Sequence, residues 1–139
     1  MHHWIGVHMI TDRIDPPELA PIPGASNVVV ASGSRLVFIS GQTGVDQDGV
    51  VAGSTHLEQA LQVFRNLVVA LDAAKATAAD VARFTIYVVD YSGDALGALM
   101  TAAIEVFGDD FPITSSTLVG VATLWQPGLL IEVDAIAIV

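Results

Sequence analysis

The sequence predicts a single α+β domain, in which two helices cover one face of a mixed β-sheet. Its 139 residues match the length of one domain. Short runs rich in β-forming residues alternate with two longer runs that carry apolar residues at every third or fourth position, as helices do. These runs follow one another in the order β-β-α-β-α-β-β, with no internal repeat or low-complexity tract between them.

We expect an irregular N-terminal lead-in, residues 1–26, followed by one domain, residues 27–139. Three histidines lie near the start of the lead-in: His2, His3 and His8. A disordered start, with Met9 as an alternative initiator, explains them better than a metal site. Prolines are concentrated between residues 15 and 24, and they favour extended, irregular backbone.

The first two strands are expected at residues 27–31 and 35–40, paired as a hairpin around a Gly-Ser turn. A helix then begins at Thr55, because Thr55 and Glu58 have the spacing of a capping box. This helix is expected to run to about residue 75. Its buried face should hold the apolar residues spaced by four and three, which are Leu57, Leu61, Phe64, Val68 and Leu71.

The second half of the domain predicts a strand, a helix and two further strands. Residues 83–88 alternate as a strand does, and Ser92 can cap the second helix. The buried stripe of that helix should hold Leu96, Met100, Ala103 and Phe107. The last strands are expected at residues 117–124 and 129–138. Because the final strand is apolar on both faces and two helices cover only one, we expect a second subunit on the other face.

The composition also favours a subunit interface. Apolar residues make up 53% of the chain and charged residues 14%, whereas a typical soluble domain has about 45–50% and about 25%. No run approaches the roughly 18 apolar residues that span a membrane, and no signal peptide is evident. We therefore expect a cytoplasmic protein with no membrane partner. The absence of cysteine excludes disulfides, zinc–thiolate sites and thiol nucleophiles.

The charge argues against nucleic acid as a partner. The net charge is −10, and no basic residue follows Arg83, whereas phosphate backbones bind clusters of Lys and Arg. The sequence contains no phosphate loop, dinucleotide fingerprint or zinc motif, so we expect neither a cofactor nor a metal ion.

Two carboxylates on the last strand are the first candidates for chemistry. By strand alternation, Glu132 and Asp134 share a face with Leu130 and Ile136. A buried Glu could have a raised pKa and could transfer protons or orient water. A position at the exposed rim, or a structural hydrogen bond, explains the pair equally well.

Two polar clusters near strand ends are further candidates. Ser40, Gly41 and Gln42 lie at the end of the second strand, where a Gly permits a close ligand contact or a β-bulge, although a plain turn is favoured. Ser116 and Thr117 belong to a hydroxyl cluster that more commonly caps or turns the chain. A Ser–His nucleophile is disfavoured, because the only internal histidine lies at the start of the first helix.

Four segments in chain order resemble the RidA/YjgF family of reactive-intermediate (enamine/imine) deaminases, also known as endoribonuclease L-PSP. They are residues 36–44 (LVFISGQTG), 84–90 (FTIYVVD), 111–112 (FP) leading into 116–122 (STLVGVA), and 130–137 (LIEVDAIA). The likeness covers about residues 28–139. No single segment is decisive, but four in order with the expected helices between them form a specific signal.

The resemblance implies a chorismate-mutase-like subunit and a homotrimer, with a central barrel and three clefts between subunits. In the family the cleft binds a small imino or keto acid, and hydrolysis of a C=N bond releases ammonia. Glu132 matches the family's Glu that helps position water, and Ser40, Gly41 and Gln42 match the motif that lines the cleft. Ser116 stands where the family has an Arg that clamps the substrate carboxylate.

The missing Arg leaves three hypotheses. A Ser hydroxyl cannot replace a guanidinium that binds a carboxylate bidentately, so the cleft should prefer neutral or cationic ligands. The chain could hydrolyse a non-anionic enamine or imine, with Glu132 orienting water and with Ser116, Ser40 and Thr117 binding the ligand. Equally, it could be a non-catalytic trimer that binds or senses a metabolite. Ribonuclease activity, attributed to some family members, is disfavoured by the charge.

Overall fold

The computed structural model describes residues 9–139, so the expectations for His2, His3 and His8 lie outside the described residues. In chain order, the strands and helices are β1 (Ile10–Ile14), β2 (Val28–Ala31), β3 (Leu36–Thr43), α1 (His56–Ala73), β4 (Val81–Val89), α2 (Gly93–Phe107), β5 (Ser115–Val121) and β6 (Ile131–Ile138). Two short 3₁₀ helices, η1 (Ala78–Asp80) and η2 (Gly108–Asp110), precede β4 and follow α2.

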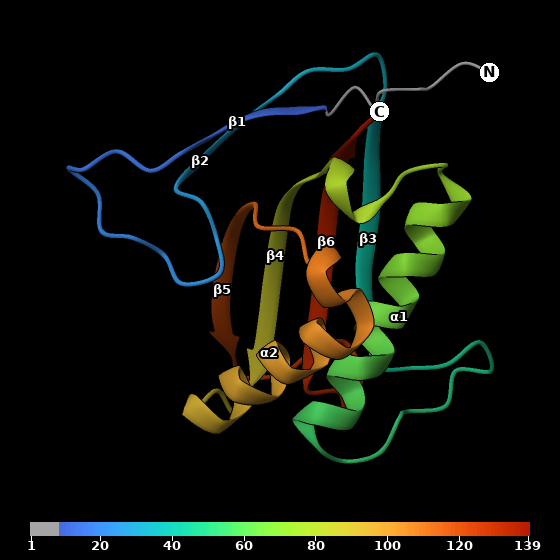
Figure 1. Ribbon diagram of the computed structural model, residues 1–139. Coiled ribbons are helices and arrows are strands. Elements are labelled where there is room, and N and C mark those ends of the chain that lie inside the picture. Colours follow the sequence, from blue (N-terminus) through green and yellow to red (C-terminus); the bar gives the residue numbers. More distant parts are fainter. Residues whose placement is uncertain (1–8) are drawn as a thin grey trace.

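Strands β3 to β6 form one mixed sheet with the order β3-β6-β4-β5. β6 is antiparallel to both of its neighbours, whereas β4 and β5 are parallel. A parallel pair needs a crossover connection, and α2 provides it between β4 and β5. Figure 1 shows α1 and α2 on the same side of the sheet. Among the described residues the opposite side carries no helix, and we call it the helix-free face. The predicted α+β fold class, with two helices on one face of a mixed sheet, is confirmed.

β1 and β2 pair with each other in a separate two-stranded ribbon. The hairpin predicted between residues 27–31 and 35–40 is therefore wrong, because Ala31 pairs with Ile10 while β3 pairs with β6. β1 also places a strand within the lead-in, residues 1–26, which was expected to be irregular; it ends just before the proline-rich residues 15–24. Alternation along a strand tells which residues share a face, but it carries no information on the partner strand.

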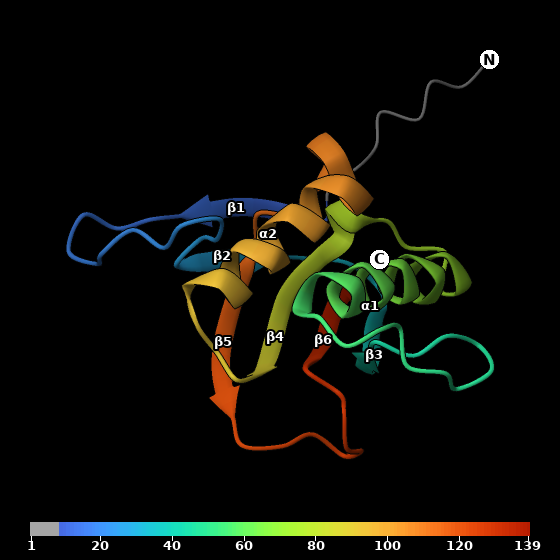
Figure 2. The same cartoon turned by 90° about the horizontal axis from the view of Figure 1, so that it is seen from below.

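The ribbon is attached to the beginning of β5. The Arg13 side chain donates a hydrogen bond through Nε to the Ile113 carbonyl (2.6 Å), and the Ser26 amide donates to the Thr114 carbonyl (3.1 Å). Figure 2 shows β1 and β2 at the left of the view, near the beginning of β5 and beside α2. The lead-in therefore lies next to the β5 edge of the sheet and next to the second helix.

Both predicted helices are present with their predicted caps. Thr55 accepts a hydrogen bond from the Glu58 amide, and Ser92 accepts one from the Ala95 amide, each at 3.2 Å. The predicted buried faces are only partly right. The buried residues of α1 are Gln59, Ala60, Val63, Phe64, Leu67 and Leu71. Those of α2 are Ala95, Leu99, Ala102, Ala103 and Phe107.

Three residues that were predicted to be buried are exposed in this chain. Leu57, Leu96 and Met100 have exposed fractions of 38%, 37% and 50%. In α2, the small side chains Ala95 and Ala102 face the core and let the helix approach α1 closely, which rotates Leu96 and Met100 away from the core. No helix within residues 9–139 is long and apolar enough to cross a membrane.

The core lies between the helices and the sheet, and strand β6 runs along its centre. Four residues of β6 are buried there: Ile131, Val133, Ala135 and Ala137. The residues between them face the helix-free side, where Ile138 pairs with Leu36 and Ile136 pairs with Phe38. Leu36 and Phe38 are 63% and 70% exposed. These four residues, Leu36, Phe38, Ile136 and Ile138, form an apolar patch on the helix-free face.

A buried glutamine ties α1 to the turn that precedes β6. Gln59 has no exposed surface (0%). Its Nε2 donates to the Gly128 carbonyl (2.8 Å), and its Oε1 accepts from the Leu130 amide (2.8 Å). Gly44 packs directly on this side chain, because a Cβ at Gly44 would lie 2.7 Å from the Gln59 Cβ. Gln59 therefore fixes the point at which β6 begins and thereby the register of the strand.

We expect Gln59→Leu to lower the free energy of unfolding by about 2–4 kcal/mol, because it removes several hydrogen bonds of about 0.5–1.5 kcal/mol each and leaves backbone groups without partners. Gln62→Leu is the matched control, since the Gln62 amide bonds Asn66 on the same helix (2.8 Å). Urea denaturation followed by circular dichroism measures both variants. An equal loss in the two would contradict the role assigned to Gln59.

Candidate functional site

Glu132 and Asp134 lie on the helix-free face of β6, inside the sheet. Glu132 is opposite Tyr87 on β4 and opposite Thr43 on β3, and Asp134 is opposite Thr85. Both carboxylates are half-buried. They point away from the core because they alternate along β6 with its buried residues. One face of β6 therefore belongs to the core, and the other face carries the two carboxylates.

A β-bulge in β3 places backbone against the Glu132 carboxyl. The register between β3 and β6 shifts between Ile39 and Gln42, so Ser40 and Gly41 form the bulge. A Cβ at Gly41 would lie 2.6 Å from both Cδ and Oε2 of Glu132, so only glycine leaves room for the carboxyl there. The plain strand-ending turn favoured for Gly41 is wrong, because β3 continues to Thr43. The alternative, a β-bulge, is the one present.

The electrostatic setting of this site favours protonated groups. Burial, and secondarily the negative charge of Asp134, raise the pKa of the Glu132 carboxyl above its ordinary value. The charge of Asp134 also raises the pKa of Tyr87, whose hydroxyl donates a long hydrogen bond to Asp134 Oδ2 (3.4 Å). Glu132 is therefore suited to accept and return a proton, which is the property that general acid–base catalysis needs.

The neighbouring residues Ser116 and Thr117 point to opposite faces of β5. Thr117 is on the helix-free face, where its Oγ1 accepts a hydrogen bond from Arg83 Nη2 (2.6 Å). Ser116 is opposite the buried residue Phe84 and lines a cavity on the helix side. Of the candidate residues, Ser40, Gly41 and Thr117 thus share a face with Glu132, while Ser116 does not.

The sheet itself separates Ser116 from Glu132 within one chain. Ser116 faces the helices, and Glu132 faces the helix-free side. One protomer alone therefore cannot apply both residues to the same ligand atom. A site that uses both must combine the helix side of one chain with the helix-free face of another.

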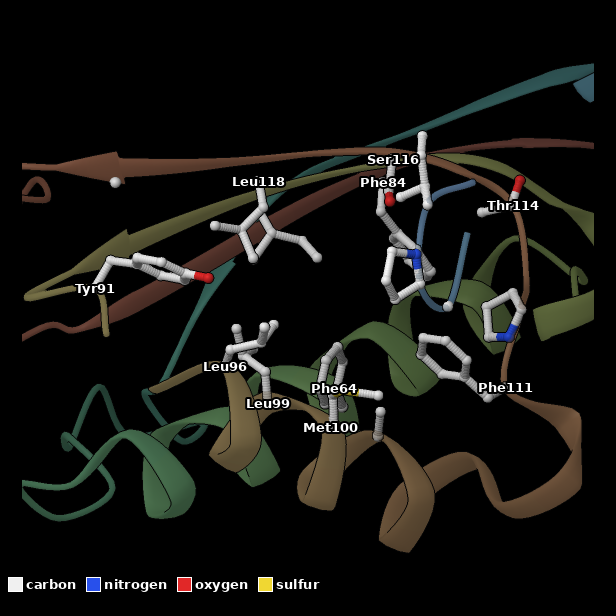
Figure 3. A pocket seen from close by; sticks show the side chains of 17 residues that line it. Phe64, Phe84, Tyr91, Leu96, Leu99, Met100, Phe111, Thr114, Ser116 and Leu118 are labelled. Carbon is white, nitrogen blue, oxygen red and sulfur yellow. The ribbon is translucent and has the colours of Figure 1, made fainter. Parts of the chain in front are cut away.

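The cavity on the helix side has a volume of about 500 Å³. It lies between α2, the β4–β5 half of the sheet and the lead-in, as Figure 3 shows. Its aliphatic and aromatic wall includes Phe84, Leu96, Leu99, Met100, Phe111 and Leu118. Ile22, Pro23 and Gly24 of the lead-in close one side. Leu96 and Met100 are exposed because they face this cavity and not the core.

Two hydroxyl groups supply the polar part of the cavity wall. Tyr91 stands at one end with its hydroxyl directed into the cavity (Figure 3), while Ser116 lies on the β5 side, next to Thr114. The Thr114 hydroxyl is buried, since the residue is 1% exposed, and it has no hydrogen-bond partner among the described residues. None of the described residues places a charged side chain on the cavity wall.

Sequence reasoning missed Tyr91 and Thr114 as members of this site. Tyr91 is placed by Asp90, which has a positive φ of 53° and turns the chain between β4 and the α2 cap. Asp is one of the few residues that adopt this conformation readily, so the Asp-Tyr-Ser sequence carried a weak turn signal. Thr114 carried no such signal. The internal histidine is used structurally, because His56 Nε2 lies 2.8 Å from the Val89 carbonyl.

Known proteins share this fold and parts of this sequence. The YyfB protein of Yersinia pestis, a Rid-family protein of unknown function, is 32% identical, with a TM-score of 0.83 over 92% of this chain and 98% of that chain. Rv2704 of Mycobacterium tuberculosis, from the YjgF/YER057c/UK114 family, is 31% identical, with a TM-score of 0.61 over 84% and 88% of the two chains. No curated protein matches the chain.

A protein of Thermotoga maritima, described as a putative endoribonuclease, is 27% identical, with a TM-score of 0.64 over 94% of this chain and 96% of that chain. The model of the family described as Endoribonuclease L-PSP matches residues 18–139, which includes the second part of the lead-in. On the strength of this match and of the shared fold, the chain belongs to the Rid/YjgF/L-PSP family.

Proposed function

We propose that the chain is a homotrimeric hydrolase that acts on a small, non-anionic enamine or imine. The site is the cleft between two subunits, where Glu132 on the helix-free face of one subunit meets the cavity of its neighbour. An enamine first tautomerises to its imine, and the imine nitrogen takes up one proton from solvent. Water adds to the carbon of the C=N bond while the Glu132 carboxylate accepts one proton of that water, which gives a neutral amino alcohol. Glu132 then returns this proton to the nitrogen, the C–N bond breaks, and the hydroxyl proton passes to the departing ammonia, so that a carbonyl compound and an ammonium ion leave.

The single observation that carries this proposal is the setting of Glu132. Its carboxyl rests against the backbone of Gly41, and burial and Asp134 raise its pKa. A general acid–base group works best when its pKa lies near the working pH, and an ordinary surface carboxylate lies well below it. The shift thus moves Glu132 in the direction that proton transfer to and from water requires.

The trimer is supported by the apolar patch on the helix-free face. Leu36 and Phe38 are largely exposed in the single chain, beside half-buried Ile136 and Ile138. Exposed contiguous apolar surface of this kind marks interaction sites. A subunit on this face would also bring a second chain next to Glu132. Because Ser116 and Glu132 lie on opposite faces of one sheet, a site that uses both residues needs such a second chain.

A non-catalytic trimer that binds a metabolite is the second candidate. It is favoured by the cavity itself, where Tyr91 is the only titratable side chain that residues 9–139 place on the wall, so chemistry there depends on the neighbouring subunit. Ribonuclease activity is not proposed, because the net charge of −10 repels phosphate backbones and because no basic side chain of the described part of the chain lines the cavity.

We expect Glu132→Gln to lower kcat/KM for hydrolysis of an uncharged imine by about 10²-fold or more, the usual effect of removing a general acid–base group. Benzophenone imine, added from dry solvent, is a suitable substrate because its hydrolysis is followed by ultraviolet absorbance. Glu105→Gln, on the exposed side of α2, is the control and should leave the rate unchanged. Wild-type turnover that survives in Glu132→Gln would overturn the assignment, and absent turnover with intact ligand binding would favour the metabolite-binding trimer.

The raised pKa of Glu132 predicts a specific pH dependence of stability. A carboxyl with a raised pKa in the folded state contributes stability that is complete below its ordinary pKa of 4.5 and is lost as the pH rises through the raised value. Relative to wild type, Glu132→Gln should therefore gain unfolding free energy between about pH 4 and about pH 7. Urea denaturation at both pH values measures the difference. A relative loss over this range would refute the shift.

Phe38→Asp should dissociate the oligomer, because burying an unpaired charge in an apolar interface is unfavourable. Light scattering coupled to gel filtration gives the mass of the assembly. Val69→Asp is the matched control, since Val69 is 68% exposed on α1 and lies away from the sheet. If wild type is monomeric, or if Phe38→Asp remains a trimer, the proposed interface is wrong.

A further inference from the structure

The cavity beside α2 has the size and surface of a site for an apolar small molecule. Its volume of about 500 Å³ falls within the range of about 300–1,000 Å³ that is usual for small-ligand pockets. Its wall combines the aromatic rings of Phe84 and Phe111 with the aliphatic chains of Leu96, Met100 and Leu118. Such a wall favours a ring or a branched hydrocarbon group.

One chain offers a carboxylate no cation on the wall of this cavity. Among the described residues no charged side chain lines it, and no basic residue follows Arg83 in the sequence. Three of the five basic side chains are engaged elsewhere: Arg13 with the Ile113 carbonyl, Arg65 with Glu105, and Arg83 with Thr117. A buried carboxylate without a charged partner is strongly disfavoured.

The hydroxyl groups, in contrast, suit one uncharged polar group. Ser116 lies on β5 at the cavity wall, and Tyr91 directs its hydroxyl into the cavity from the opposite end (Figure 3). The hydroxyl of Thr114, just before β5, is buried beneath the wall. A hydroxyl can donate or accept, so these groups can bind the oxygen or nitrogen of a neutral carbonyl or imine.

We propose that the ligands of this cavity carry no carboxylate, and that each combines an apolar ring or branched chain with one neutral carbonyl or imine group. The apolar part lies against Met100, Leu96 and Leu118, and the polar part binds the hydroxyl of Ser116. The lead-in segment Ile22–Gly24, held near β5 by the Ser26–Thr114 hydrogen bond, sets the length of the apolar part. This inference rests on the proposed function, and it names the substrate class of the same cleft.

A matched pair of probes tests whether the cavity excludes carboxylates. Benzylacetone and 2-oxo-4-phenylbutanoate share a phenyl group and a ketone, but benzylacetone has a methyl group where 2-oxo-4-phenylbutanoate has a carboxylate. Isothermal titration of the full-length protein should show benzylacetone binding at least about tenfold more tightly. Equal or tighter binding of the keto acid, or binding of neither probe, overturns the proposal.

Two variants locate the binding in the cavity. Met100→Trp fills the space and should abolish benzylacetone binding, whereas Ile104→Trp, one helical turn later at a 67% exposed position outside the cavity, should retain it. Ser116→Arg should reverse the preference and raise keto-acid affinity at least about tenfold. Benzylacetone binding that is unaffected by Met100→Trp, or a preference unchanged by Ser116→Arg, contradicts the assignment.

Failure of this inference is distinct from failure of the proposed function. If benzylacetone binds as described but Glu132-dependent turnover is absent, the proposed ligand class is supported and the proposed hydrolase activity is refuted. Imines that an amino-acid oxidase forms from amino acids carry a carboxylate. If turnover depends on Glu132 but occurs only with such imines, the proposed hydrolase activity is supported and the proposal of neutral ligands is refuted.

Discussion

Strand β6 has strands on both of its edges but helices on only one of its faces, and most of the structure depends on this constraint. Ile131 and Val133 are fully buried beneath the helices, so alternation sends Glu132 and Asp134 to the helix-free face. A shift of the register by one residue would exchange the two sets and bury both carboxylates. The hydrogen bonds of Gln59 to the turn before β6 oppose such a shift, and so a buried side chain of α1 determines where the carboxylates lie.

The same constraint divides the helix-free face into two chemical regions. One region holds Glu132, Asp134 and Tyr87, and the other is the apolar patch around Phe38. A protein surface that covers the patch would also remove water from the neighbouring carboxylates. Since burial already raises the pKa of Glu132 in one chain, a subunit at this position would strengthen the shift. In the proposed trimer, assembly and the proton chemistry of Glu132 would be coupled through one face of the sheet.

The features that could be predicted from the sequence are those that local physics determines. The helix caps at Thr55 and Ser92 and the alternation along β6 depend on residues a few positions apart. The partner of β2 and the rotation of α2 depend on contacts between distant segments, and both were predicted wrongly or in part. Whether Ser116 and Glu132 can belong to one site also depends on contacts between distant segments. The likeness of four segments points to Ser116 and Glu132, but only the register between β4, β5 and β6 reveals that they occupy opposite faces.

If Ser116 replaces an Arg of the family, as the resemblance implies, the loss of that Arg has two physical interpretations, and the surroundings of Ser116 distinguish them. If only the cation were missing, the remaining wall would still suit an anion, with polar groups placed around a charge. Here the neighbours are Leu118, Met100 and Phe84, and the polar groups are uncharged hydroxyls, which cannot neutralise a carboxylate. A guanidinium among these side chains would itself be desolvated without a partner whenever the ligand was absent. The whole wall is therefore consistent with Ser116, and this agreement across several residues indicates a different ligand in preference to a damaged site.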